Sequence, residues 1–130
     1  MNRRSRRVII KRSALDSIIS YCKMRHPNEA ILILCGKSDK DTITVERLMI
    51  PPFSYFGPYY SGFPTMLLPF DRSILGTMHS HPNGSSEPSL TDLNSDFIGY
   101  ISIIVSYPYE DGDVHVYNSR GERLEYSVAE

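Results

Sequence analysis

The chain has 130 residues and a mass of 14.8 kDa, the size of one ordinary domain. Its net charge of −1 excludes a nucleic-acid binder that depends on overall positive charge. Nine prolines, eight glycines and nine tyrosines suit short strands and shaped loops better than a helical bundle. We therefore expect one domain over residues 1–130 and no nucleic-acid partner.

The basic residues are concentrated at the N-terminus. Six of them and no acidic residue occupy positions 1–12, and terminal charge runs are usually solvated, so we expect residues 1–7 to form a flexible basic tail. The apolar run Val8–Ile10 is too short for a signal peptide, and Ala30–Cys35 is far below the roughly 20 residues of a membrane span. The sequence predicts a cytoplasmic protein without a membrane segment.

The first half of the chain alternates strand and helix signals. A strand is expected at Val8–Lys11, followed by a helix that Ser13 caps and Pro27 ends. The buried face of that helix would hold Leu15, Ile18, Ile19 and Cys22. The apolar run Ala30–Cys35 predicts a buried strand ended by Gly36, and Thr42–Ile50 predicts its hairpin partner.

Residues 51–65 form a segment of different character, in which prolines and glycines oppose regular structure. A long aromatic loop either packs on the core or is shaped to bind a partner, and the sequence leaves both interpretations open. Its aromatic residues are Phe53, Tyr55, Phe56, Tyr59, Tyr60 and Phe63.

The second half predicts a strand at Ile74–His81 and a helix at Leu90–Phe97 with Ser89 as its N-cap. Three more strands are expected at Tyr100–Tyr107, Asp113–Asn118 and Glu122–Val128. This order predicts an α/β domain with a mixed, mostly antiparallel sheet flanked by helices.

Two histidines in the strand Ile74–His81 are the first chemical signal. His79 and His81 are two residues apart, so both point to the same face of a strand. Neighbouring imidazoles need polar partners, and a zinc ion can bind both. A His-x-His pair alone is a weak signal of a metal site.

Three further residues strengthen the signal. Asp92 follows a turn and can bring a carboxylate to the two imidazoles, which leaves the fourth zinc position for water, as in catalytic sites. Asp92 is also an ordinary first-turn acid, and Ser89 is also an ordinary N-cap. Glu29, next to the apolar strand Ala30–Cys35, is the candidate base, since carboxylates seldom enter such strands.

Together these residues resemble the JAMM motif of the catalytically competent MPN-domain metalloproteases, which include deubiquitinating enzymes. The motif has an upstream Glu, His-Ser/Thr-His-Pro, six residues, Ser, two residues and Asp. Glu29, the run from His79 to Pro82, Ser89 and Asp92 match it without a gap. The resemblance implies a cytidine-deaminase-like α/β fold and one zinc per chain held by His79, His81 and Asp92. It also implies Glu29 as general base and then acid, with Ser89 stabilising the oxyanion.

The resemblance also implies a substrate. Family enzymes cleave the amide after the C-terminal Gly-Gly of ubiquitin or a ubiquitin-like modifier. This chain has no room after Asp92 for the second insertion of eukaryotic members, so it is similar to the compact prokaryotic type. The expected substrate is a ubiquitin-like or sulfur-carrier protein of the β-grasp type. Residues 53–65 lie where the family's first insertion lies and are expected to line the groove for the modifier's tail.

Other functions remain as alternatives. A non-catalytic MPN scaffold or binding module is disfavoured because every motif position is filled. A nucleobase deaminase needs His-x-Glu and Pro-Cys-x-x-Cys, and neither occurs. A cysteine hydrolase using Cys35 is disfavoured because that residue lies in an apolar run, and Cys22 and Cys35 are expected to be buried free thiols. The oligomeric state, a homodimer included, stays open.

Overall fold

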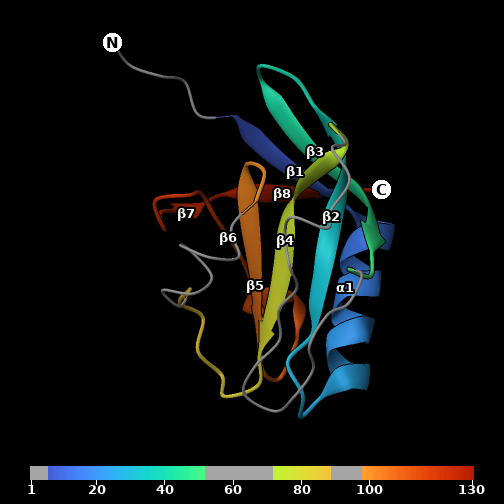
Figure 1. Cartoon of the computed structure of the whole chain (residues 1–130), viewed down its shortest axis with the longest axis vertical. Coiled ribbons are helices and arrows are strands. Elements are labelled where there is room, and N and C mark those ends of the chain that lie inside the picture. Colours follow the sequence, from blue (N-terminus) through green and yellow to red (C-terminus); the bar gives the residue numbers. More distant parts are fainter. Residues whose placement is uncertain (1–5, 52–71, 89–97) are drawn as a thin grey trace.

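The fold is known from a computed structural model, which describes residues 6–51, 72–88 and 98–130. The expected helix at Leu90–Phe97 and the aromatic segment lie outside these residues. The described elements are β1 (Arg7–Lys11), α1 (Arg12–Arg25), β2 (Ile31–Ser38), β3 (Thr42–Met49), β4 (Ile74–His81), β5 (Ile101–Ser106), the 3-10 turn η2 (Asp111–Asp113), β6 (Val114–Tyr117), β7 (Arg123–Leu124) and β8 (Tyr126–Ala129). Figure 1 shows α1 beside a sheet in which β2, β4 and β5 run through the centre.

The described strands form one mixed sheet in the order β7-β6-β5-β4-β2-β3-β1-β8. Four neighbouring pairs are antiparallel, namely β2 with β3, β2 with β4, β5 with β6 and β6 with β7. β4 and β5 are parallel, and β1 is parallel to both β3 and β8. The predicted fold class, a mixed and mostly antiparallel α/β domain, is confirmed.

The sheet curls so strongly that its two edges meet. β7 and β8 are its outermost strands, yet only Glu125 separates them along the chain. The Tyr126 hydroxyl of β8 donates to the Val114 carbonyl of β6 at 3.1 Å, which is a contact across the closed side of the curl. The single strand expected at Glu122–Val128 is therefore wrong, because the chain leaves one edge of the sheet there and joins the other.

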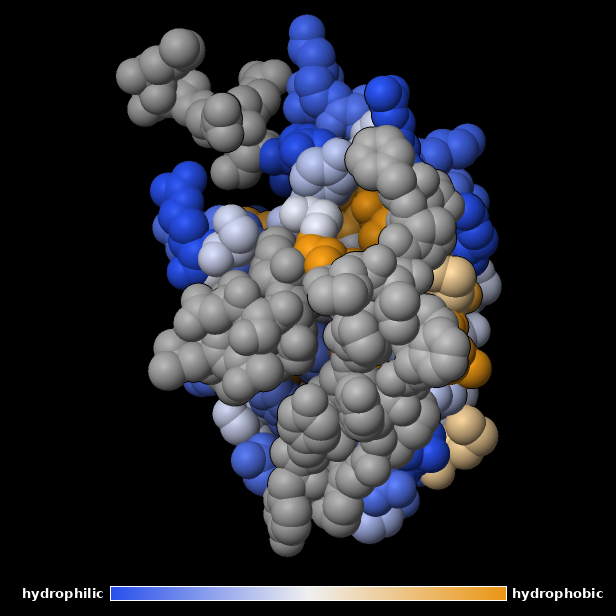
Figure 2. All heavy atoms as spheres, viewed as in Figure 1, coloured by the Kyte–Doolittle hydropathy of each residue, from blue (hydrophilic) through white to orange (hydrophobic). Residues whose placement is uncertain are grey.

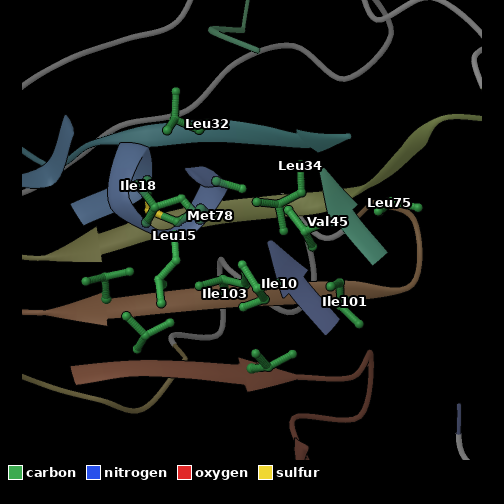
Figure 3. Packing of buried hydrophobic residues seen from close by; sticks show 14 of the residues in the cluster. Ile10, Leu15, Ile18, Leu32, Leu34, Val45, Leu75, Met78, Ile101 and Ile103 are labelled. Atoms are coloured by element: carbon green, nitrogen blue, oxygen red, sulfur yellow. The ribbon is translucent and has the colours of Figure 1, made fainter. Parts of the chain in front are cut away.

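The larger hydrophobic cluster lies on the face of the sheet that α1 covers. Its members include Ile10 of β1 and Val116 of β6, which come from distant strands and can share one cluster because the sheet curls. Figure 3 shows Leu15 and Ile18 of α1 beside Met78 of β4. Figure 2 shows hydrophilic residues gathered along the margins of the molecule in that view, notably at the end with β1 and the β2–β3 turn.

A smaller cluster lies on the opposite face. It consists of Ile31, Ile33 and Cys35 of β2, with Met49, Ile74 and Ile98 packed against them. Because β2 has apolar side chains on both faces, it is buried throughout its first six residues. The strand that leads into the candidate site is thus fixed from both sides.

Several strand ends differ from the sequence prediction by one residue, and two boundaries differ for a clear structural reason. α1 begins at Arg12 with Lys11 as its N-cap and no side-chain cap, because β1 runs directly into the helix, so Ser13 is not the cap. β2 continues past Gly36 to Ser38 through an irregularity at Cys35/Gly36. Glycine is required there because a Cβ would lie 1.9 Å from the Thr44 carbonyl oxygen.

Arg6 and Arg7 make contacts with other parts of the described chain. The Arg7 amide donates to the Asp41 carbonyl at 2.8 Å, and the Arg6 guanidinium lies 4.4 Å from the centre of the Tyr100 ring. Arg6 and Arg7 therefore belong to the fold rather than to the basic tail expected over residues 1–7. In the described ranges, no helix combines the length and apolarity that crossing a membrane requires.

Candidate metal centre

The two histidines of the motif lie at the end of β4, on the face opposite α1. Met78 belongs to the cluster under α1, and successive side chains of a strand alternate between faces. His79 and His81 therefore project together from the other face, beside Ile31 and its neighbours. His79 is 1% exposed and His81 is half-buried, so the pair leads from the protein interior to its surface.

The pairing of β2 with β4 places Glu29 next to these histidines. Ile31 is opposite His79 in the antiparallel register, and the Ser80 amide donates to the Ala30 carbonyl at 2.9 Å. Glu29 precedes Ala30 by one residue, so the same register continued by one pair would set Glu29 opposite His81, on the same face. Residues opposite one another in this way have Cβ atoms about 5 Å apart, so the half-buried Glu29 lies at the strand end that carries the two imidazoles.

Ser80 fixes this register from the other face of the sheet. Its side chain is fully buried, and its hydroxyl accepts a hydrogen bond from the Ala30 amide at 2.7 Å. Ala30 and Ser80 thus exchange two hydrogen bonds, one of them through a side chain. Sequence reasoning missed this role, because the partner of a buried serine depends on a strand register that no local pattern specifies.

A backbone carbonyl in the turn after β4 orients the His81 ring. His81 Nδ1 lies 2.9 Å from the Ser85 carbonyl oxygen. Since a carbonyl only accepts, Nδ1 carries the proton and the lone pair of the ring is on Nε2. This is the usual arrangement of a metal-binding histidine, whose other nitrogen donates to a carbonyl or carboxylate.

The residues present fit a zinc ion. Two imidazoles from one strand face, one of them oriented through its Nδ1 proton, match the donor set that zinc prefers, and a carboxylate ligand would complete a three-residue catalytic site. Within residues 6–51, 72–88 and 98–130, no group of three potential ligands gathers. The expected third ligand, Asp92, lies outside the described residues, as do Ser89 and the aromatic segment.

An aromatic cluster of His26, Tyr107 and Tyr109 lies next to the site. His26 Nδ1 and the Tyr109 hydroxyl are 2.7 Å apart, and the His26 and Tyr107 rings stack with centroids 4.8 Å apart. Burial raises the pKa of Tyr109 to about 12. The Tyr107 amide donates to the His81 carbonyl at 3.1 Å, so the cluster joins the end of α1, shortly before Glu29, to the strand end that carries His81.

The position of Cys22 does not suit a nucleophile. Cys22 and Cys35 are free and buried, as predicted. Burial raises the pKa of Cys22 to about 12, and its Sγ lies 3.7 Å from the Met78 sulfur inside the core. A thiol with that pKa stays protonated at neutral pH and is a poor nucleophile.

Comparisons with known proteins identify the family of this chain. Residues 11–119 match the family described as prokaryotic homologues of the JAB domain (Prok-JAB). A probable metalloprotease of Haloferax volcanii is 33% identical over 132 residues, which covers 96% of this chain and 82% of that protein.

Two solved structures share both fold and sequence similarity with this chain. One, described as JAMM, a metalloprotease-like zinc site in the proteasome and signalosome, is 32% identical with a TM-score of 0.70, covering 95% of this chain and 99% of the other. The second, a JAB1/MPN domain protein from Archaeoglobus fulgidus, is 35% identical with a TM-score of 0.70, covering 93% and 98%. The described β4 and β2 therefore belong to a fold that carries a zinc site in a relative.

Proposed function

The chain belongs to the Prok-JAB family, the compact prokaryotic type of JAMM/MPN protein, and from that membership we propose that it is a zinc metalloprotease. The observation that supports the proposal is the register of β2 and β4, in which Ile31 pairs with His79 and the Ser80 amide donates to the carbonyl of Ala30, the residue after Glu29. We propose that the Glu29 carboxylate moves a proton beside a metal ion held by the two imidazoles. The probable metalloprotease of Haloferax volcanii supports the same reaction class.

His79 and His81 would hold the ion, with Asp92 as the proposed third ligand. Bound zinc supplies a Lewis acid that makes water nucleophilic at neutral pH. Glu29 takes the proton from the attacking water and then gives it to the leaving amine. The Ser89 hydroxyl donates a hydrogen bond to the oxyanion of the tetrahedral intermediate.

The proposed substrate is a ubiquitin-like or sulfur-carrier protein of the β-grasp type, cleaved at the amide that follows its C-terminal Gly-Gly. Glycine residues have no side chain, so such a tail can pass through a narrow site close to two strands. The aromatic residues of segment 53–65 are proposed to line the groove for that tail. Action in the cytoplasm suits the two free thiols, Cys22 and Cys35, since cytoplasmic thiols stay reduced.

Replacement of Glu29 by Gln tests the proton-transfer role. The substrate is a β-grasp modifier fused through its Gly-Gly tail to a reporter protein. We expect wild type to release the reporter, and Glu29→Gln to lower the cleavage rate about 10²- to 10⁴-fold. Zinc content should stay unchanged, because Glu29 is not a proposed ligand.

The same assay separates the enzyme from a binding module. If wild type and Glu29→Gln bind the modifier with equal affinity and wild type does not cleave it, the chain is a binding module instead. Glu46→Gln is a matched control, because Glu46 pairs with Lys11 at 3.2 Å, lies in β3 and has no proposed part in the reaction. This control should cleave at the wild-type rate.

A further inference from the structure

The turn that orients His81 is itself held by a buried tyrosine from another strand. Tyr117 of β6 is 1% exposed, and its hydroxyl donates to the Ser86 carbonyl. Ser86 directly follows Ser85, whose carbonyl accepts the proton of His81 Nδ1. One hydrogen bond from the core therefore lies next to the hydrogen bond that aligns a candidate zinc ligand.

The turn needs such an anchor because most of it is exposed. Asn83, Gly84 and Ser85 are all exposed. The hydrogen bonds within the turn are short-range: the Gly84 amide donates to the His81 carbonyl at 3.0 Å, and the Ser85 amide donates to the Asn83 side chain at 3.0 Å. These bonds shape the turn, but they do not tie it to the sheet beyond β4. Tyr117 supplies that link from two strands away.

A neighbouring cation sets the direction of the Tyr117 hydroxyl. Arg123 of β7 donates to the Tyr117 oxygen at 3.2 Å, and its guanidinium lies 5.8 Å from the ring centre. A phenol has one proton to donate. Since Arg123 donates to the hydroxyl oxygen, the hydroxyl proton points to the Ser86 carbonyl.

We propose that Tyr117 is a positioning residue for the zinc ligand His81, acting through the Ser85–Ser86 backbone. The inference rests on the proposed zinc site and adds a residue outside the JAMM motif to it. Removing a group that orients a metal-binding histidine commonly lowers metal affinity by roughly 10- to 100-fold. Tyr117 acts one peptide further away, so the lower end of that range applies.

Zinc affinity of the full chain tests the inference, measured by competition with a chromogenic chelator. We expect Tyr117→Phe to raise the Kd for zinc about 10-fold. The matched control is Tyr126→Phe, which also removes a tyrosine hydroxyl that donates to a backbone carbonyl, at 3.1 Å on Val114, but away from His81. This control should bind zinc like wild type.

A second readout detects the positioning itself. The His81 Nδ1 proton, followed by nitrogen-15 NMR, should exchange with water faster in Tyr117→Phe than in wild type and Tyr126→Phe. Unchanged zinc affinity and unchanged exchange in Tyr117→Phe overturn the inference. Equal weakening in both tyrosine variants also overturns it, because the effect is then a general loss of stability.

A third variant keeps the two proposals distinguishable. His81→Ala should abolish tight zinc binding. If His81→Ala binds zinc as wild type does, the zinc site of the proposed function is wrong as well. If only Tyr117→Phe behaves like wild type, the zinc site stands and the role of Tyr117 alone is rejected.

Discussion

At the residue scale, Ser80 shows how one buried hydroxyl sets the geometry of the candidate metal centre. It accepts a hydrogen bond from the Ala30 amide, and Ala30 directly follows Glu29. A buried hydrogen bond of this kind contributes about 1 kcal/mol, and an unpaired buried amide costs about 1–3 kcal/mol. The alignment of the proposed base with the histidines thus depends on a residue that has no proposed part in the chemistry.

Cys22 gives a pH dependence of stability with a defined sign. Burial raises the thiol pKa from its ordinary value of 9.0 to about 12. Between these values the unfolded chain has released the proton while the folded chain keeps it. The stabilising contribution of the neutral thiol is complete below pH 9 and is lost as the pH rises toward 12, by at most about 1.4 kcal/mol per pH unit.

Denaturant unfolding at a series of pH values from 8 to about 10.5 measures this effect. We expect the free energy of unfolding of wild type to fall above pH 9, and that of Cys22→Ala to fall less steeply. Below pH 9 the alanine variant is less stable than wild type because it leaves a cavity in the core. Parallel pH profiles for the two proteins would show that the Cys22 thiol does not contribute the slope.

At the element scale, the close approach of β4 and β5 depends on Gly76. A Cβ at this position would lie 1.8 Å from the Ile101 carbonyl oxygen. Because this oxygen belongs to the backbone, no side-chain rotation can relieve the clash. Gly76 and Ile101 are also partners in the parallel register. Any side chain would push β5 away from the strand that carries His79 and His81.

Gly76→Ala should therefore destabilise the fold by about 3 kcal/mol or more. Gly112→Ala is the matched control, because a Cβ at Gly112 meets nothing within 4 Å. Thermal unfolding of the two variants without metal compares them directly. Equal unfolding midpoints would mean that the strands tolerate a wider separation than the structure indicates.

At the scale of the whole molecule, the curl of the sheet brings together strands that are far apart in the sequence. β8 pairs in parallel with β1, and β7 lies on the far edge beside β6. On that far edge, Tyr117 of β6 and Arg123 of β7, from the last part of the chain, support the turn after β4. The candidate metal centre is therefore supported from several parts of the chain.

The strand positions and the shared face of the histidines could be predicted from sequence, since both follow from local periodicity. The run Ile74–His81 was predicted with the bounds that the structure shows. The passage of the chain from one edge of the sheet to the other at Glu125 could not be predicted. The roles of Ser80 and Tyr117 could not be predicted either. They depend on long-range pairing and on the direction of backbone carbonyls, for which a sequence has no local pattern.

Zinc content tests the central claim most directly. Wild type and His79→Ala, purified alike without added metal and with trace-metal-free buffers, are analysed by plasma mass spectrometry against protein concentration. A catalytic site of this type predicts about one zinc per chain in wild type and a small fraction of that in His79→Ala. Wild type without zinc, or the same zinc content in both proteins, would contradict a metal centre at the end of β4.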